Sequence, residues 1–148
     1  MEIEKKFTIK KLPENLTEYP FHLIEQAYLN TDPVIRIRRQ DDEYYLTYKG
    51  KGLLAREEYN LPLNAQSYTH LLAKADGNVI TKKRYLIPYK DHTIELDVFD
   101  KPFAPLVIAE VEFDSLDNAN AFIAPDWFQE DVTYDKQYHN SNLSKRVF

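Results

Sequence analysis

The first residues of the chain carry charges whose types and spacing could do chemistry. Glu2, Glu4 and Lys6 follow the pattern E-x-E-x-K, and alternate residues of a strand share one face. Carboxylates gathered on one face suit a hard divalent cation such as Mg²⁺ or Mn²⁺. A lysine beside them suits the oxygens of an anion. Because such a pattern also arises by chance in charged sequences, its meaning depends on what the rest of the chain offers.

Charged residues at alternate positions recur along the later apolar runs. They are Arg36 and Arg38, Lys49, Arg56 and Glu58, Lys82 and Arg84, Glu95 and Asp97, and Glu110 and Glu112. Acids gather in the first run and the last two, whereas bases gather in the runs between them. If these runs are strands of one sheet with their charged faces inward, the sheet encloses a basic arc opposite an acidic arc.

The alternative interpretation is an ordinary one-sided sheet whose charged face lies in water. The density of charge on that face, with hardly any Ser, Gln or Thr, argues against it. Burying one ion costs several kcal/mol, whereas a whole domain is stable by only about 5–15 kcal/mol. Enclosed charges must therefore stay hydrated, pair with one another, or await a ligand of opposite charge. A polyanion bridged by divalent cations would satisfy both arcs.

Strands dominate the elements that must position these residues. Alternation and composition predict strands at 2–10, 26–30, 34–40, 43–49, 55–61, 79–89, 92–99 and 106–113. Helices are predicted at 13–22, at 65–75 with Asn64 as N-cap and Gly77 as the stop, and at 117–123. The fold class is therefore α+β with a dominant antiparallel sheet, and a sheet of about eight strands tends to curl or close.

Composition limits the class of protein. The 148 residues have room for one domain, 1–148. The absence of cysteine excludes disulfides and cysteine nucleophiles and fits a reducing cytosol. A net charge of −5 argues against general nucleic-acid binding. No signal peptide or run of about 20 apolar residues is visible. We expect a cytoplasmic protein with no membrane or nucleic-acid partner; a homodimer is left open.

The chain resembles the CYTH family, also called triphosphate tunnel metalloenzymes, across essentially its whole length. The matching segments are E-I-E-K-K-F at the start, I-R-I-R from Ile35, L-T-Y-K-G from Leu46, R-E-E-Y from Arg56, T-K-K-R-Y from Thr81, I-E-L-D-V-F from Ile94, A-E-V-E-F from Ala109, and D-V-T-Y-D-K-Q-Y-H-N-S-N-L from Asp131. The resemblance implies a closed eight-stranded antiparallel β-barrel, a tunnel with a polar lumen and helices packed outside. It also implies metal-dependent hydrolysis of inorganic triphosphate to pyrophosphate and phosphate.

The resemblance assigns roles residue by residue. The metal, Mg²⁺ or Mn²⁺, would be held by Glu2, Glu4 and Glu112, with Glu110 beside them. The triphosphate would be bound by Lys6, Arg36, Arg38, Lys49, Arg56, Lys82, Arg84 and Lys136. Lys6, Glu58 and Asp97 would act in catalysis, the two acids together with Glu95 by orienting basic residues or a metal-bound water. The segment around Lys136, Tyr138 and Asn140 would close one mouth of the tunnel.

Other activities of the same family remain alternatives. They are a class IV-type adenylate cyclase and a nucleoside or thiamine triphosphatase. A module that binds polyphosphate without hydrolysing it would need the basic arc but not the carboxylates of the first and last strands, so their presence favours an enzyme. The four histidines, His22, His70, His92 and His139, have no metal-ligand spacing and are expected to be surface or structural residues.

Overall fold

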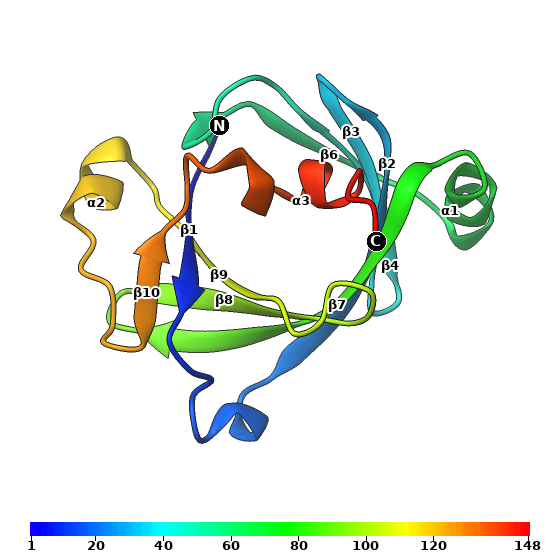
Figure 1. Ribbon diagram of the computed structural model, residues 1–148. Helices are drawn as coiled ribbons and strands as arrows, with labels where there is room; N and C mark the ends of the chain where they lie inside the picture. Colours follow the sequence, from blue (N-terminus) through cyan, green and yellow to red (C-terminus); the bar gives the residue numbers. More distant parts are fainter.

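The computed structural model describes residues 1–148, and its main element is one ten-stranded antiparallel sheet (Figure 1). The strands are β1 (Glu2–Ile9), β2 (Phe21–Thr31), β3 (Val34–Gln40), β4 (Glu43–Lys49), β5 (Ala55–Arg56), β6 (Glu58–Pro62), β7 (Asp76–Tyr89), β8 (His92–Phe99), β9 (Val107–Glu112) and β10 (Phe128–Asp131). Their order is β10-β1-β9-β8-β7-β2-β3-β4-β6, with β5 paired to β1 as a branch. Figure 1 shows the sheet curving around a central space.

The prediction of a closed eight-stranded barrel is wrong. The predicted strand 55–61 is interrupted at Glu57, so that β5 pairs with β1 whereas β6 pairs with β4. The edge of β1 that faces away from β9 is shared between β5, near Glu2 and Ile3, and β10, beyond Phe7. The ladder therefore begins at β10 and ends at β6, and these two strands do not pair with each other.

The segment before β2 also differs from the prediction. A helix was expected over 13–22, but only a 3₁₀ turn forms, Leu16–Glu18, and β2 already begins at Phe21. The physical reason is Pro20, which disfavours helical geometry at the residue before it. Tyr19 accordingly has ψ of 147°, in the extended region.

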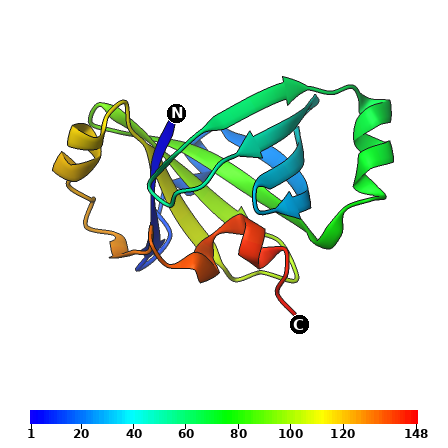
Figure 2. The same ribbon diagram turned by 90° about the horizontal axis from the view of Figure 1, so that it is seen from above.

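Three short helices lie around the sheet: α1 (Ala65–Leu72), α2 (Leu116–Ala121) and α3 (Asn140–Leu143). Asn64 caps α1 as predicted, because its side chain accepts a hydrogen bond from the Ser67 amide. Figures 1 and 2 show α1 and α2 outside opposite sides of the curved sheet, whereas α3 crosses one end of it. None of these helices has the length and apolarity to cross a membrane.

The largest apolar cluster lies on the outer side of the sheet, whereas the inner side carries most of the buried charges together with part of a second apolar cluster. The largest cluster packs Phe7, Leu96 and Val111 against residues from the segment that carries α2 and β10. A second cluster surrounds Leu143 of α3 and includes Tyr28 from β2. Packing of α3 against β2 thus holds the end of the chain across one end of the inner space.

Candidate active site

The inner side of the sheet holds a cavity of about 300 Å³, a size typical of small-ligand sites. Most of the predicted site residues line it: Glu2, Glu4, Lys6, Arg36, Arg38, Lys49, Arg56, Glu58, Arg84, Glu95, Glu110 and Glu112. They come from eight strands, β1 and β3 to β9. Alternation places them inward, because each is separated from the next on its strand by one residue of the opposite face.

Three of the predicted residues do not line this cavity. Lys82 and Asp97 are both fully buried and form an ion pair of 2.7 Å between Nζ and Oδ2. Asp97 also binds the guanidinium of Arg84 at 2.8 and 2.9 Å, so it reaches the cavity only through Arg84. Lys136 is exposed and lines a neighbouring depression together with Arg56 and His139.

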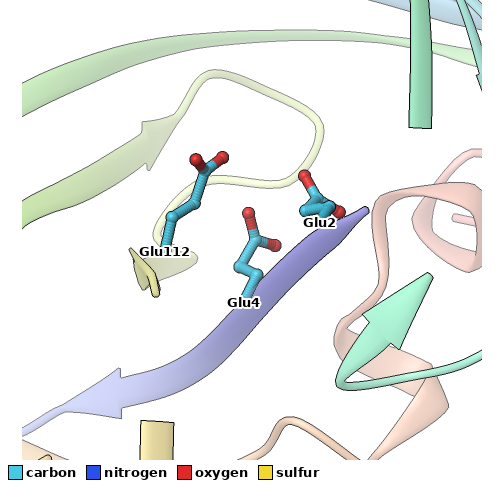
Figure 3. Close-up of side chains that lie close together, drawn as sticks. All are labelled: Glu2, Glu4 and Glu112. Carbon is cyan, nitrogen blue, oxygen red and sulfur yellow. The ribbon is translucent and has the colours of Figure 1, made fainter. Parts of the chain in front are cut away.

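Glu2, Glu4 and Glu112 line the cavity and form an acidic cluster, in which the three side chains lie close together (Figure 3). Each offers a carboxylate oxygen, and these oxygens lie within 4.8 Å of one another. Strand register causes the contact, because Glu4 of β1 stands directly opposite Glu112 of β9. Like charges in facing positions destabilise a sheet. Lys6, 3.3 Å from Glu4, and Lys49, 3.0 Å from Glu2, offset part of this repulsion, and a cation bound between the carboxylates would relieve it further.

The pKa values of the acidic cluster reflect this repulsion. Although Glu112 is exposed on one side, partial loss of hydration, followed by repulsion from Glu4 and Glu95, raises its pKa to about 7. Burial and Glu4 raise the pKa of Glu2 to about 8, although Lys49 acts in the opposite direction. Three converging oxygen donors, two of them reluctant to ionise without a counter-charge, fit a hard divalent cation.

Glu110 has a different environment from the acidic cluster, although it lies only two residues from Glu112. Its Oε1 accepts a hydrogen bond from Lys6 Nζ at 2.6 Å, and its Oε2 accepts one from Arg84 Nη2 at 3.0 Å. Burial acts to raise the pKa of Glu110, but Lys6 and Arg84 hold it well below its usual range. Glu110 thus balances two buried cations. It also belongs to a second set of three carboxylates, with Glu4 and Glu95, whose nearest oxygens lie within 4.8 Å of one another.

The remaining lysine and arginine on the β1, β4 and β5 side are also paired with carboxylates. Lys49 Nζ lies 3.0 Å from Glu2 and 3.2 Å from Glu58. Arg56 Nε lies 3.8 Å from Glu2, too far for a hydrogen bond, and this buried atom has no other partner. Glu2 thus links the acidic cluster to the basic residues next to it.

Arg36 and Arg38 of β3 are the exception, because no carboxylate lies within 4.0 Å of either guanidinium. Their side-chain acceptors are neutral: Thr47 Oγ1 for Arg36, at 3.2 Å, and Gln26 Oε1 for Arg38. Both arginines are nearly inaccessible, with 6% and 8% exposure. Burial, with repulsion from Arg36 and Arg84, lowers the pKa of Arg38 to about 9. We call Arg36 and Arg38 the unpaired arginines; they give the β3 side of the cavity an excess of positive charge.

The C-terminal segment supplies further lining residues, of which the sequence analysis named only Asn140, as part of the segment expected to close the tunnel. His139, expected to be a surface or structural residue, is 5% exposed and lines the cavity. Its Nε2 contacts the Thr133 carbonyl at 2.9 Å, which leaves Nδ1 without a protein partner in the hydrogen-bond pattern. Asn140 also lines the cavity, and its Oδ1 accepts a hydrogen bond from Lys82 at 3.2 Å. The resemblance of this segment to a family motif was the one sequence signal for these residues. It did not separate them from Lys136 and Tyr138, which do not line the cavity.

Comparisons with known proteins place the chain in a family. The CYTH domain model matches residues 1–146. An inorganic triphosphatase of Nitrosomonas europaea is 40% identical over 151 residues, which cover 99% of this chain and 98% of that protein. An inorganic triphosphatase of Acetivibrio thermocellus is 35% identical, with 99% and 95% covered.

Among solved structures, the crystal structure of an inorganic triphosphatase superimposes with a TM-score of 0.74. It is 36% identical, and the superposition covers 99% of this chain and 96% of that one. The family match spans nearly every residue, and the two curated relatives exceed 30% identity over nearly their whole length. This chain therefore belongs to the CYTH domain family.

Proposed function

We propose that this protein is a metal-dependent inorganic triphosphatase, which cleaves tripolyphosphate with water into pyrophosphate and phosphate. The observation that carries the proposal is the division of one cavity into an acidic cluster and a pair of unpaired arginines. Such a cavity complements a polyanion that is bridged by a divalent cation. The names of the full-length relatives support the same activity.

The metal would be held by Glu2, Glu4 and Glu112. When bound, a divalent cation stabilises negative charge on a phosphoryl oxygen and favours ionisation of water. Mg²⁺ and Mn²⁺ both prefer oxygen donors, and the choice between them stays a prediction.

The unpaired arginines would bind phosphate oxygens through charge-assisted hydrogen bonds, for which guanidinium geometry is suited. Lys6 and Arg84 would add positive charge nearby. Burial acts against the charge of Lys6, but Glu110 and Glu4 raise its pKa above the usual range, so the side chain stays an ammonium ion. Lys6 therefore acts as a cation that neutralises charge developing on the transferred phosphoryl group, and not as a general base.

Glu58 and Asp97 would act through the basic residues they hold. Glu58 Oε2 lies 3.2 Å from Lys49 Nζ, and Asp97 fixes Arg84 from behind the cavity. Such contacts hold donors in place before the substrate arrives, which is how phosphoryl transfer enzymes obtain much of their rate. Lys136, which lies outside the cavity, has no place in this arrangement.

Inorganic triphosphate is favoured over nucleotides because the cavity offers little to an organic group. Only three of its 20 lining residues are hydrophobic. Adenylate cyclase, nucleoside triphosphatase and thiamine triphosphatase activities would each need a surface for a base, sugar or thiazolium. The cytoplasmic location, the absence of a nucleic-acid partner and the oligomeric state stay predictions.

The test is phosphate release from tripolyphosphate, ATP and thiamine triphosphate, measured side by side with Mg²⁺ or Mn²⁺. We expect kcat/KM for tripolyphosphate to exceed that for ATP by at least about tenfold, equivalent to about 1.4 kcal/mol of transition-state stabilisation. Glu112→Gln serves as the matched control, because it keeps the shape of the side chain and removes one metal ligand. Equal or faster turnover of ATP, or formation of cyclic AMP, would overturn the proposal.

A further inference from the structure

Arg38 stands out among the cations around the cavity because its acceptor is a neutral amide. Lys6, Lys49, Arg56, Lys82 and Arg84 each have a carboxylate within 4.0 Å. Arg38 instead donates from both Nε and Nη2 to Gln26 Oε1, at 2.9 and 2.6 Å. Gln26 is fully buried, so water does not compete for this acceptor.

The orientation of the Gln26 amide is set by chemistry. A guanidinium has only donors, so the oxygen of the amide must face it and the amide nitrogen must point away. That nitrogen, Nε2, is buried and has no hydrogen-bond partner. A buried donor without a partner costs stability, and a glutamate of the same length would remove that donor and give Arg38 a counter-ion.

Strand pairing makes the contact a fixed part of the sheet. Gln26 of β2 stands directly opposite Arg38 of β3, and on its other side β2 pairs with β7 through Gln26 and Ile80. This pairing holds the Gln26 side chain beside the Arg38 guanidinium. It does not line the cavity itself, whereas Arg38 does.

We propose that Gln26 is a positioning residue that holds the Arg38 guanidinium in place without neutralising it, so that its charge remains available to the substrate. The inference rests on the proposed function, since it takes the ligand of Arg38 to be tripolyphosphate. A carboxylate at this position would orient the guanidinium equally well, but it would compete with the phosphate oxygens for the same charge. The lowered pKa of Arg38, caused by burial and by Arg36 and Arg84, agrees with a site short of negative charge.

Gln26→Glu tests the proposal, because it keeps the length and shape of the side chain and adds one negative charge. We expect the melting temperature of the ligand-free variant to rise, since Arg38 is already buried and gains a counter-ion. We expect KM for tripolyphosphate to rise at least about tenfold, with a smaller change in kcat, because a charge used in both ground and transition states is lost. A residue with only a packing role would not move stability and affinity in opposite directions.

Two further variants make the test specific. Gln66→Glu adds the same charge on an exposed position of α1 and should leave KM unchanged. Gln26→Met removes the acceptor without adding charge, so it should raise KM but lower the melting temperature. Affinity is also measured directly, by calorimetry with tripolyphosphate in the presence of a chelator.

The outcomes separate this inference from the proposed function. If wild type binds tripolyphosphate and Gln26→Glu binds it equally well, Gln26 does not control the charge of Arg38 and the inference is wrong. If wild type neither binds nor hydrolyses tripolyphosphate with Mg²⁺ or Mn²⁺ present, the proposed function is wrong. The melting temperatures then decide the local claim alone, and a Gln26→Glu variant less stable than wild type would overturn it.

Discussion

Glu110→Gln should reveal whether the buried carboxylates around the cavity serve different purposes. Glu110 is 3% exposed, and each of its two oxygens accepts a hydrogen bond from a cation. Glutamine keeps the shape but retains one acceptor, and its NH₂ group would face either Lys6 or Arg84. Removing one partner of a buried ion pair costs about 3–5 kcal/mol.

That cost converts into a large change in melting temperature. An unfolding entropy of about 2.1 cal/mol/K per residue gives about 0.3 kcal/mol/K for a chain of 148 residues. We therefore expect Glu110→Gln to lower the melting temperature at pH 7 by about 10–16 °C. Differential scanning calorimetry without metal or substrate measures it directly.

The pH dependence has a definite sign. The pKa of Glu110 is depressed in the folded protein, so the carboxylate contributes stability above its unfolded value near 4.5. This contribution is lost as the pH falls from 4.5 towards the folded pKa. Wild type and Glu110→Gln should therefore converge in stability at acid pH.

Glu112→Gln provides the matched comparison, since it makes the same change two residues along the same strand face. Loss of hydration, and then repulsion from Glu4 and Glu95, raises the pKa of Glu112 to about 7. Its removal should leave the metal-free melting temperature at pH 8 unchanged or higher. If both variants lower the melting temperature to a similar extent, the two carboxylates do not differ in role and the reasoning is refuted.

Three further outcomes are expected. Without metal, wild type should lose stability as the pH rises from 4.5 through about 7, because a raised carboxyl pKa favours the folded state only while Glu112 is protonated; chelator-treated melts should show the loss, and melts with excess Mg²⁺ should not. Arg38→Met should raise the ligand-free melting temperature and reduce the stabilisation by tripolyphosphate, and equal ligand-induced shifts in variant and wild type would exclude Arg38 as a ligand. Lys136→Ala should change KM for tripolyphosphate less than about twofold, since an exposed charge outside the cavity is screened by solvent.

The inner faces of the strands could be predicted from the sequence because alternation depends only on the chain itself. Arg36 and Arg38 point inward as expected, and the same holds for Glu95. The quoted motifs also predicted the CYTH family correctly. The same resemblance, however, led to the wrong prediction of a closed barrel. Closure of the barrel depends on whether the chain after β4 forms one strand or two. The sequence around Glu57, where the strand is interrupted, has no pattern that distinguishes one strand from two.

The partners of each charge could not be predicted, since they depend on register between strands far apart in the sequence. Glu110 and Glu112 share one strand and one face, yet register sets the first opposite Lys6 and the second opposite Glu4. Gln26 gave no sequence signal, because a single uncharged residue at the start of a predicted strand looks like any solvent-facing position. Its importance appears only where β2 meets β3.

The ion pairs of the cavity explain how so much charge can be buried in a protein that must still bind a polyanion. Most cations are balanced by carboxylates, which limits the cost of burial. Two departures from balance remain: an acidic excess at Glu2, Glu4 and Glu112, and a basic excess at Arg36 and Arg38. Each departure lowers the stability of the empty protein, and each is relieved by a ligand of opposite charge. A cation at the acidic cluster and a polyphosphate at the unpaired arginines would therefore bind cooperatively, because each also attracts the other within the same cavity.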